Sequence, residues 1–306
     1  MKTKNVTLNR SIIGAACAGA VLLAASSATA QNLFAANYTT GTIYQYTPGG
    51  SGTLFASGML NPVGIAFDGA GDLFVGNSDN NVHSGATEFG NITEITPGGV
   101  QSTFASGIDP QGIAFNAAGD LFEADYQSGN IYEYAPNGSR TLYATGFSLP
   151  LAMTFDSAGN LFIGSGFGNG NGLITEITPG GTRSTFASSL SFPEGIAFNS
   201  TGTMFVANNG AGNIIEITSG GTQSTFATLS NSALPNLLAF NSAGTLFVTD
   251  NAGHIDEFTA GGTESTFATQ SGGVIDGLAF APVPEPSSLA LAGLGGVALL
   301  FRRRKS

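Results

Sequence analysis

Three polar side chains take the same place beside a phrase that the chain repeats six times. Glu194, Asn236 and Asp276 each come directly before one copy. Carboxylate and amide oxygens are the ligands that hard divalent cations such as Ca²⁺ prefer. The other three copies are preceded by Val63, Gln111 and Leu151. Because the three polar residues are absent from the other copies, they are candidates for function; the alternative is a solvated polar rim.

The repeated phrase indicates the elements that must position these residues. Its copies are Gly64–Phe67, Gly112–Phe115, Ala152–Phe155, Gly195–Phe198, Leu237–Phe240 and Gly277–Phe280, and their closing phenylalanines are 40 to 48 residues apart. A period of this length is typical of stacked supersecondary units. One full copy, residues 61–108, contains four runs rich in β-branched and aromatic residues. Four antiparallel strands in forty-odd residues are typical of a β-propeller blade.

The two ends of the repeat predict how the ring closes. The chain after residue 31 begins with a second strand, Leu33-Phe34, and continues with a third (42–47) and a fourth (53–57). The first strand of that blade is found only at the far end, as Gly277–Phe280. We therefore predict an all-β, six-bladed β-propeller over residues 31–282, with one blade shared between the N- and C-terminal strands. Such sharing removes the free edges of the ring.

Successive turns of a meandering blade fall on opposite faces of the ring, so each loop can be assigned to one of the two faces. The residues before the repeated phrase and the loops between second and third strands share one face. That face has the longest loop, residues 77–91, which contains His83. Because variable loops on a rigid scaffold usually carry binding residues, we place the ligand face there and include Gln111 and His83 in it.

Residues that recur in most copies are interpreted as scaffold. One set of glutamates occupies the same position in five third strands: Glu94, Glu133, Glu176, Glu216 and Glu257. A second set ends the second strands: Asn37, Asn77, Asp125, Asn208 and Asp250. The Asp68–Asp72 segment lacks the spacing of a calcium loop and is interpreted as a turn. His254 has no evident orienting partner, so the sequence gives no catalytic residue.

The charge balance excludes some partners. Residues 31–281 hold nineteen acidic residues, two arginines and no lysine, a net charge of −17. Such a surface repels phosphate backbones, so we expect no nucleic-acid partner. Cys17 is the one cysteine and lies in the N-terminal segment, so no disulfide is expected in the propeller.

The first thirty residues are typical of a secretory signal peptide. Lys2, Lys4 and Arg10 precede an apolar run from Ile12 to Ala25, and Ala28-Thr29-Ala30 offers a small-residue cleavage site. We predict export and a mature chain that begins near Gln31. A lipoprotein signal ending at Cys17 is the alternative.

The wording of the repeat resembles the NHL-repeat and gluconolactonase-like propellers. The elements that carry the resemblance are Pro110–Phe115 and Leu246–Asp250, and it extends over residues 32–281. In gluconolactonase-like enzymes the position of Glu194, Asn236 and Asp276 supplies metal ligands, so the resemblance implies Ca²⁺ or another divalent cation. The chain departs from that family in offering no evident basic group near the channel mouth for a substrate acid.

The C-terminal segment resembles the PEP-CTERM sorting signal of Gram-negative bacteria. Pro284-Glu285-Pro286 is followed by thirteen apolar residues, expected to form a short hydrophobic helix, and by Arg302, Arg303, Arg304 and Lys305. The run is short for a permanent span, which needs about 20 residues. Over residues 283–306 the resemblance implies an exosortase as partner, transient contact with the membrane, and release or attachment at the cell surface. A plain membrane anchor is the alternative.

Two functions follow as hypotheses. The first is a non-enzymatic, exported propeller that serves as a binding or extracellular-matrix module, with extracellular polysaccharide or surface proteins as partners. The second is a divalent-metal-dependent hydrolase or lactonase. The sequence favours the first, because it contains a sorting signal and no catalytic constellation.

Overall fold

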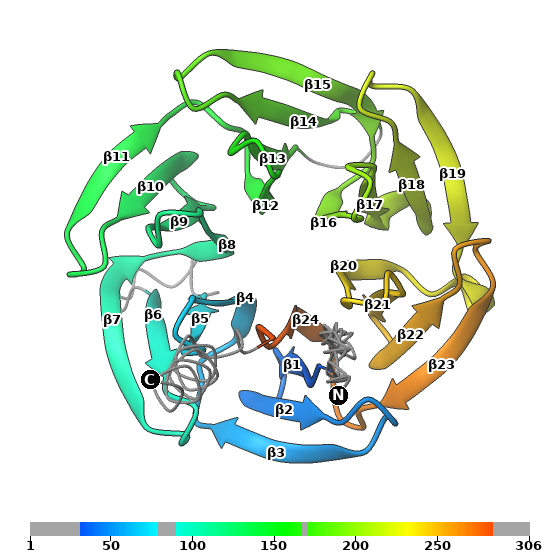
Figure 1. Ribbon diagram of the computed structural model, residues 1–306, viewed down its shortest axis with the longest axis horizontal. Helices are drawn as coiled ribbons and strands as arrows, with labels where there is room; N and C mark the ends of the chain where they lie inside the picture. Colours follow the sequence, from blue (N-terminus) through cyan, green and yellow to red (C-terminus); the bar gives the residue numbers. More distant parts are fainter. Residues whose placement is uncertain (1–30, 79–89, 167–169, 284–306) are drawn as a thin grey trace, which may run out of the picture.

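The computed structural model describes residues 31–78, 90–166 and 170–283, which form a ring of six four-stranded antiparallel sheets (Figure 1). Each sheet is one blade, and in five of the six the strands follow one another in chain order from the central channel to the rim. The predicted six-bladed all-β propeller is thus confirmed. Among these residues no helix has the length and apolar character needed to cross a membrane.

Blades are numbered here by the order of their first, innermost strands. Blade 1 is β4 (Pro62–Phe67), β5 (Leu73–Asn77), β6 (Gly90–Ile95) and β7 (Gln101–Ile108). Blade 2 is β8 (Pro110–Phe115), β9 (Leu121–Asp125), β10 (Asn130–Tyr134) and β11 (Arg140–Ala144). Blade 3 is β12 (Pro150–Phe155), β13 (Leu161–Ser165), β14 (Gly172–Ile177) and β15 (Arg183–Leu190). Blade 4 is β16 (Pro193–Phe198), β17 (Met204–Asn208), β18 (Asn213–Ile217) and β19 (Gln223–Thr228). Blade 5 is β20 (Pro235–Phe240), β21 (Leu246–Asp250), β22 (His254–Phe258) and β23 (Glu264–Thr269).

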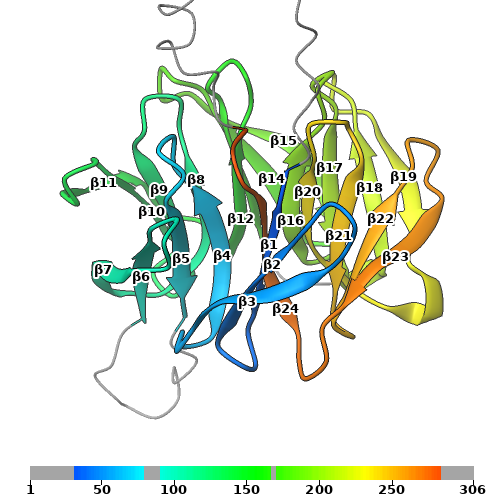
Figure 2. The same cartoon turned by 60° about the horizontal axis from the view of Figure 1, so that its bottom comes forward.

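Blade 6 joins the two ends of the chain, as the sequence predicts. Its order is β24 (Ile275–Phe280), β1 (Leu33–Asn37), β2 (Thr42–Tyr46) and β3 (Gly52–Ser57). In Figure 2, which brings this blade forward, β24 in orange lies beside β1 in blue. Pairing continues past the strand ends, where the Gln31 Nε2 donates to the Ala281 carbonyl at 2.8 Å and the Ala281 N–H donates to the Asn32 carbonyl at 3.0 Å.

The closing phenylalanine of the repeated phrase locks each blade to the one before it. An aromatic ring of the second strand meets one ring from the fourth strand of its own blade and one from the first strand of the next. Centroids are 4.9–5.1 Å apart in edge-to-face geometry, as in Phe162 with Phe186 and Phe198. Such pairs contribute roughly 0.5–1.5 kcal/mol each beyond their buried area. The period of the sequence is therefore the period of the inter-blade core.

The glycine that opens four copies of the phrase is required by close packing around the channel. A Cβ at Gly64, Gly112, Gly195 or Gly277 would lie 2.5–2.7 Å from a backbone carbonyl of the next first strand. Those carbonyls belong to Gln111, Leu151, Asn236 and Val63, the residues that precede the next phrase. The glycines thus set the distance between neighbouring residues of the channel wall.

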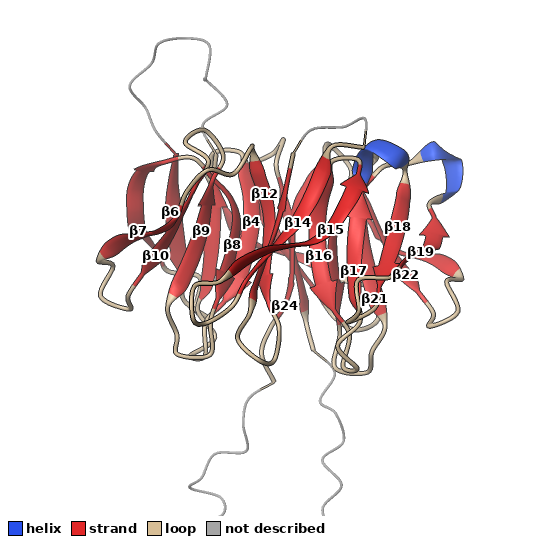
Figure 3. Ribbon diagram, turned by 90° about the horizontal axis from the view of Figure 1, so that it is seen from above, coloured by secondary structure: helices blue, strands red, loops and turns tan. Residues whose placement is uncertain are grey.

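The recurring polar residues act as scaffold in the structure. The Asp68 carboxylate accepts from the N–H groups of Ala70 and Asp72, which closes the turn between β4 and β5. The Glu94 carboxylate accepts a cross-strand bond from the Ser102 hydroxyl at 3.4 Å. The strand-ending residues bond to nearby backbone, as Asn37 does with the Thr40 N–H. Two short 3₁₀ turns, η1 (Asn209–Ala211) and η2 (Ser230–Ser232), were not expected, and both lie on the same face (Figure 3).

Both ends of the described chain leave on the face opposite the 3₁₀ turns. Pro282 and Val283 line a cavity with Gly69–Gly71 and Pro97, which belong to turns of that face. The Gln31 side chain also accepts from the Ser242 N–H in another such turn. The predicted signal peptide (1–30), His83, and the sorting residues Pro284, Glu285, Pro286, Arg302, Arg303 and Arg304 lie outside the described residues.

Candidate functional site: the channel mouth

The residues that precede the repeated phrase meet at one end of the channel. Val63, Gln111, Leu151, Glu194, Asn236 and Asp276 are the second residues of the six innermost strands, and with Leu237 they line a cavity of about 70 Å³. The set is called the channel mouth below. The structure thus brings together four candidate residues from the sequence, Gln111, Glu194, Asn236 and Asp276, with Val63 and Leu151 as apolar members of the ring. Whether they bind a metal stays a prediction.

Glu194, Asn236 and Asp276 belong to one chain of hydrogen bonds. The Asn209 Nδ2 donates to the Glu194 carboxylate at 2.9 Å and to the Asn236 Oδ1 at 3.0 Å. The Asn236 Nδ2 then donates to the Asp276 carboxylate at 3.0 Å. Two carboxyl groups are therefore held at the ends of an amide pair, with Asn236 buried at the centre.

Burial makes both carboxyl groups weak acids. Desolvation, helped by the nearby Asp276 charge, raises the pKa of Glu194 to about 8, although the Asn209 amide opposes the shift. Desolvation likewise raises the pKa of Asp276 to about 6, against the hydrogen bond from Asn236. A raised pKa means that the ionised form lacks a sufficient cationic partner at this place.

The mouth extends to a second group of polar residues from blades 1 and 2. The Gln111 Nε2 donates to the Ser78 hydroxyl at 3.1 Å, and that hydroxyl donates to the Asp109 carboxylate at 2.7 Å. The pKa values of two tyrosines are raised by the same acids. For Tyr38 the largest cause is burial, followed by the charges of Asp276 and Asp109. For Tyr126 it is again burial, followed by the charges of Asp109 and Glu194.

Sequence reasoning missed Asn209, Ser78, Tyr38 and Tyr126, and one signal could have found them. Each directly follows the recurring residue that ends a second strand, and no residue type holds this position in more than two blades. These positions begin the loops between second and third strands. By the rule that singled out Glu194, these variable residues were also candidates.

The chemistry available at the mouth is that of oxygen ligands and weak carboxylic acids. Glu194 and Asp276 fit a divalent cation, because its charge would offset two desolvated carboxylates. The Asn236 amide presents its nitrogen to Asp276, so a cation between them requires that amide to turn its oxygen inward. Among the described residues the two arginines begin the outer strands β11 and β15, where they stack on the rings of Tyr132 and Phe147.

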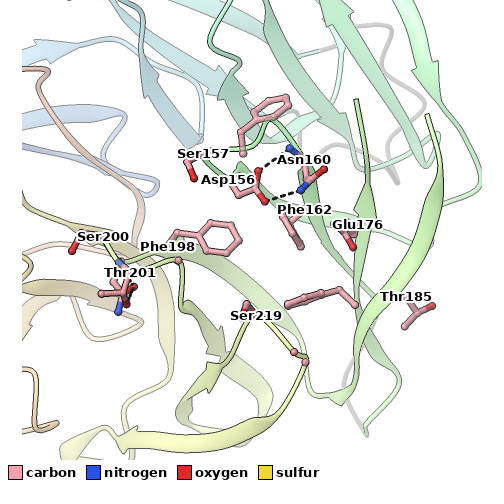
Figure 4. Close-up of a pocket in the computed structure, with 16 residues that line it drawn as sticks. Asp156, Ser157, Asn160, Phe162, Glu176, Thr185, Phe198, Ser200, Thr201 and Ser219 are labelled. Carbon is pink, nitrogen blue, oxygen red and sulfur yellow. Dashed lines mark hydrogen bonds between the residues drawn. The ribbon is translucent and has the colours of Figure 1, made fainter. Parts of the chain in front are cut away.

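A larger cavity lies elsewhere and has a different character. It measures about 690 Å³ and opens between blades 3 and 4, on the face opposite the channel mouth (Figure 4). Its polar groups are mostly engaged in turns. The Asp156 carboxylate, for example, accepts from both the backbone N–H and the side-chain amide of Asn160. The Phe162, Phe186 and Phe198 triad forms its wall, so the cavity follows from the scaffold.

A sequence-family model matches the C-terminal end of the chain. Residues 282–305 match the PEP-CTERM protein-sorting motif, as the resemblance in the sequence predicts. This motif indicates an exported protein that is sorted to the surface of a Gram-negative bacterium and processed by an exosortase. No curated protein sequence matches the chain.

Solved structures of similar fold include a putative gluconolactonase and streptogramin-type lyases. A putative gluconolactonase superposes with a TM-score of 0.61 at 15% identity, covering 80% of this chain and 89% of that one. Virginiamycin B lyase from Staphylococcus aureus, crystallised with quinupristin as an inactive variant, gives 0.58 at 16% identity, covering 80% and 87%. A streptogramin B lyase gives 0.58 at 17% identity, covering 79% and 80%. At such identities the similarity establishes the fold alone.

Proposed function

We propose that the protein is an exported binding propeller of the cell surface or extracellular matrix, whose channel mouth holds a divalent cation. The proposal of a cation rests on one observation. Glu194 and Asp276 are desolvated, have raised pKa values, and are linked through the side-chain amides of Asn209 and Asn236. Ca²⁺ suits such oxygen ligands, and water molecules would complete its coordination. The sorting motif supports the surface location, with extracellular polysaccharide or surface proteins as the partners of the same face.

A metal-dependent hydrolase or lactonase is the second candidate. The observation that favours it is the burial of Glu194 and Asp276, which as ionised ligands could hold a cation that acts as a Lewis acid. The cation would polarise a carbonyl, and Asn209 and Asn236 would orient the substrate. The putative gluconolactonase among the similar structures gives this candidate a fold-level precedent only.

The cation is tested by calorimetric titration of Ca²⁺ into the purified protein. We expect one strong site per chain, weakened at least tenfold (about 1.4 kcal/mol) by Glu194→Gln and by Asp276→Asn. Glu216→Gln, at a recurring scaffold position in the blade of Glu194, is the matched control and should leave the titration unchanged. Equal binding in all four proteins would rule out a cation at the mouth.

Catalysis is tested separately from binding. Release of acid from a panel of aldonolactones, followed with a pH indicator in the presence of Ca²⁺, distinguishes the two candidates. The binding module predicts no turnover above the uncatalysed rate. Turnover that disappears in Glu194→Gln would favour the hydrolase instead.

A further inference from the structure

Blade 5 gathers a second set of metal-ligating side chains, well outside the innermost ring of strands. Asp250 ends β21, His254 begins β22, and Asp256 lies two residues further along β22. One ligand atom from each of the three lies within 4.8 Å of the others. None of them belongs to the channel mouth. The sequence interpretation counted Asp250 as scaffold, found no orienting partner for His254 and did not consider Asp256.

In the other blades the same three positions hold at most one charged side chain, Asp125 in blade 2. In blade 1 they are Asn77, Asn91 and Thr93, and the Asn77 Nδ2 donates to the Asn91 Oδ1 at 2.8 Å and to the Thr93 hydroxyl at 2.9 Å. In blade 4 the Asn208 Nδ2 donates to the Asn213 Oδ1 at 2.8 Å. The scaffold therefore brings these positions into ligand distance in several blades. Blade 5 fills all three with ligand types: two carboxylates and an imidazole.

The amide networks of blades 1 and 4 carry no charge, whereas the blade 5 set has excess negative charge. Asp250 and Asp256 are 1% and 4% exposed, and His254 is the basic member of the set, with its Nδ1 2.8 Å from the Asp250 Oδ2. Glu264 lies near enough to raise the pKa of His254, after the larger effect of Asp250. Even a protonated imidazole offsets only one of the two buried carboxylates, while a divalent cation would offset both.

The environment of Asp256 also shows that the set lacks compensating positive charge. Desolvation is the largest cause that raises its pKa to about 6, and the Thr266 hydroxyl on the neighbouring strand β23 opposes the shift only in part. The side chain of His254 is 38% exposed, so the set opens to solvent on that side. An ion could enter there and keep a water ligand.

We propose that Asp250, His254 and Asp256 form a binding site for a first-row transition-metal ion of the Zn²⁺ class. One nitrogen and two carboxylate oxygens are a ligand set that Zn²⁺ accepts at roughly 2.0–2.2 Å, with a fourth position left to water. Imidazole favours such ions over Ca²⁺, so this site and the channel mouth would select different metals.

The test uses Zn²⁺ itself and two variants that copy the sister blades. His254→Asn introduces the asparagine that blades 2 and 4 have at the equivalent position, Asn130 and Asn213. Asp256→Thr introduces the threonine that blades 1 and 3 have there, Thr93 and Thr175. Both variants should therefore be compatible with the fold. We expect one Zn²⁺ per chain by calorimetry, weakened at least a hundredfold by either change. Co²⁺ bound in place of Zn²⁺ should give visible absorption bands that both variants lose, and Glu216→Gln should behave as wild type.

Binding at the channel mouth is separated by the double variant Glu194→Gln, Asp276→Asn. Zinc binding that persists in it, and is then lost on adding His254→Asn, assigns the ion to blade 5. The proposal is overturned if the wild-type protein binds no Zn²⁺, or if His254→Asn and Asp256→Thr bind it as well as wild type. Far-UV circular dichroism of both variants confirms that each is folded, so loss of binding can be attributed to loss of ligands.

Discussion

Glu123 is a buried carboxyl group at a position that other blades fill with apolar side chains. It is 0% exposed, and its counterparts in blades 1, 4 and 5 are Val75, Val206 and Val248. The Tyr134 hydroxyl donates to one carboxylate oxygen at 3.3 Å, and the other oxygen has no hydrogen-bond partner among the described residues. Desolvation, followed by the charge of Asp125, raises the pKa of Glu123 to about 8.

We therefore predict that Glu123→Val stabilises the protein, most strongly in alkali. A carboxyl group whose folded pKa is raised contributes stability below its unfolded pKa of about 4.3 and loses it as the pH rises through about 8. The variant should gain roughly 1–3 kcal/mol in free energy of unfolding at pH 9 and less at pH 5. Urea titrations at both pH values measure this. A variant no more stable than wild type at pH 9 would contradict the prediction.

Some residues of the candidate sites could be identified from the sequence, and others could not. Glu194 and Asp276 could be found because the repeat supplies their register relative to the channel. Asn209 could be marked as a variable position, but its bonds to Glu194 and Asn236 could not be foreseen, because they depend on a 3₁₀ turn that places its amide between residues of blades 4 and 5. Asp256 was missed because the sequence alone gives no distance between it and His254.

At the scale of elements, the first strands act as spacers around the channel. The Gly195 position matters most for the candidate site, since a Cβ there would lie 2.7 Å from the Asn236 carbonyl. Backbone cannot yield as readily as a flexible side chain. Any larger residue must therefore push β20, and with it Asn236, away from β16.

Gly195→Ala should accordingly weaken both the ring and the channel mouth. We expect a loss of about 1–3 kcal/mol in unfolding free energy, the usual cost of overpacking, together with weaker Ca²⁺ binding. Gly220→Ala is the matched control in the same blade, because its Cβ would meet only the Thr218 hydroxyl at 3.9 Å. Thermal unfolding and Ca²⁺ calorimetry compare the two variants. Equal stability and equal Ca²⁺ affinity would contradict the prediction and show that β20 can move away from β16 without loss.

The elements themselves were largely predictable. The predicted strand runs of residues 61–108 correspond to β4 to β7, and no end differs by more than two residues. Period and turn residues suffice for this, since each blade repeats one pattern of alternation. The aromatic triads were not foreseen, because they join residues of different blades and so depend on how the sheets stack.

At the scale of the whole molecule, the sorting segment and the ring are separate units. The last strand ends at Phe280, and the matched motif begins at residue 282. Replacing Pro284, Glu285 and Pro286 with alanine should therefore abolish processing and leave the Ca²⁺ titration unchanged. Intact-mass spectrometry of the protein made in an exosortase-containing host measures this. The neighbouring change Ser287→Ala, Ser288→Ala is the control, and a normal mature mass in the triple variant would refute the prediction.

The pairing of Gln31 with Ala281 also gives the molecule an orientation. Both ends of the ring leave at one pole, and the channel mouth opens at the other. A tether that begins after Val283 would act as a stalk beneath the ring and turn Glu194 and Asp276 toward the surrounding medium. Dissolved ions and polymers would then reach the site without passing between the protein and the lipid. Cutting the stalk would release the ring with every blade still closed.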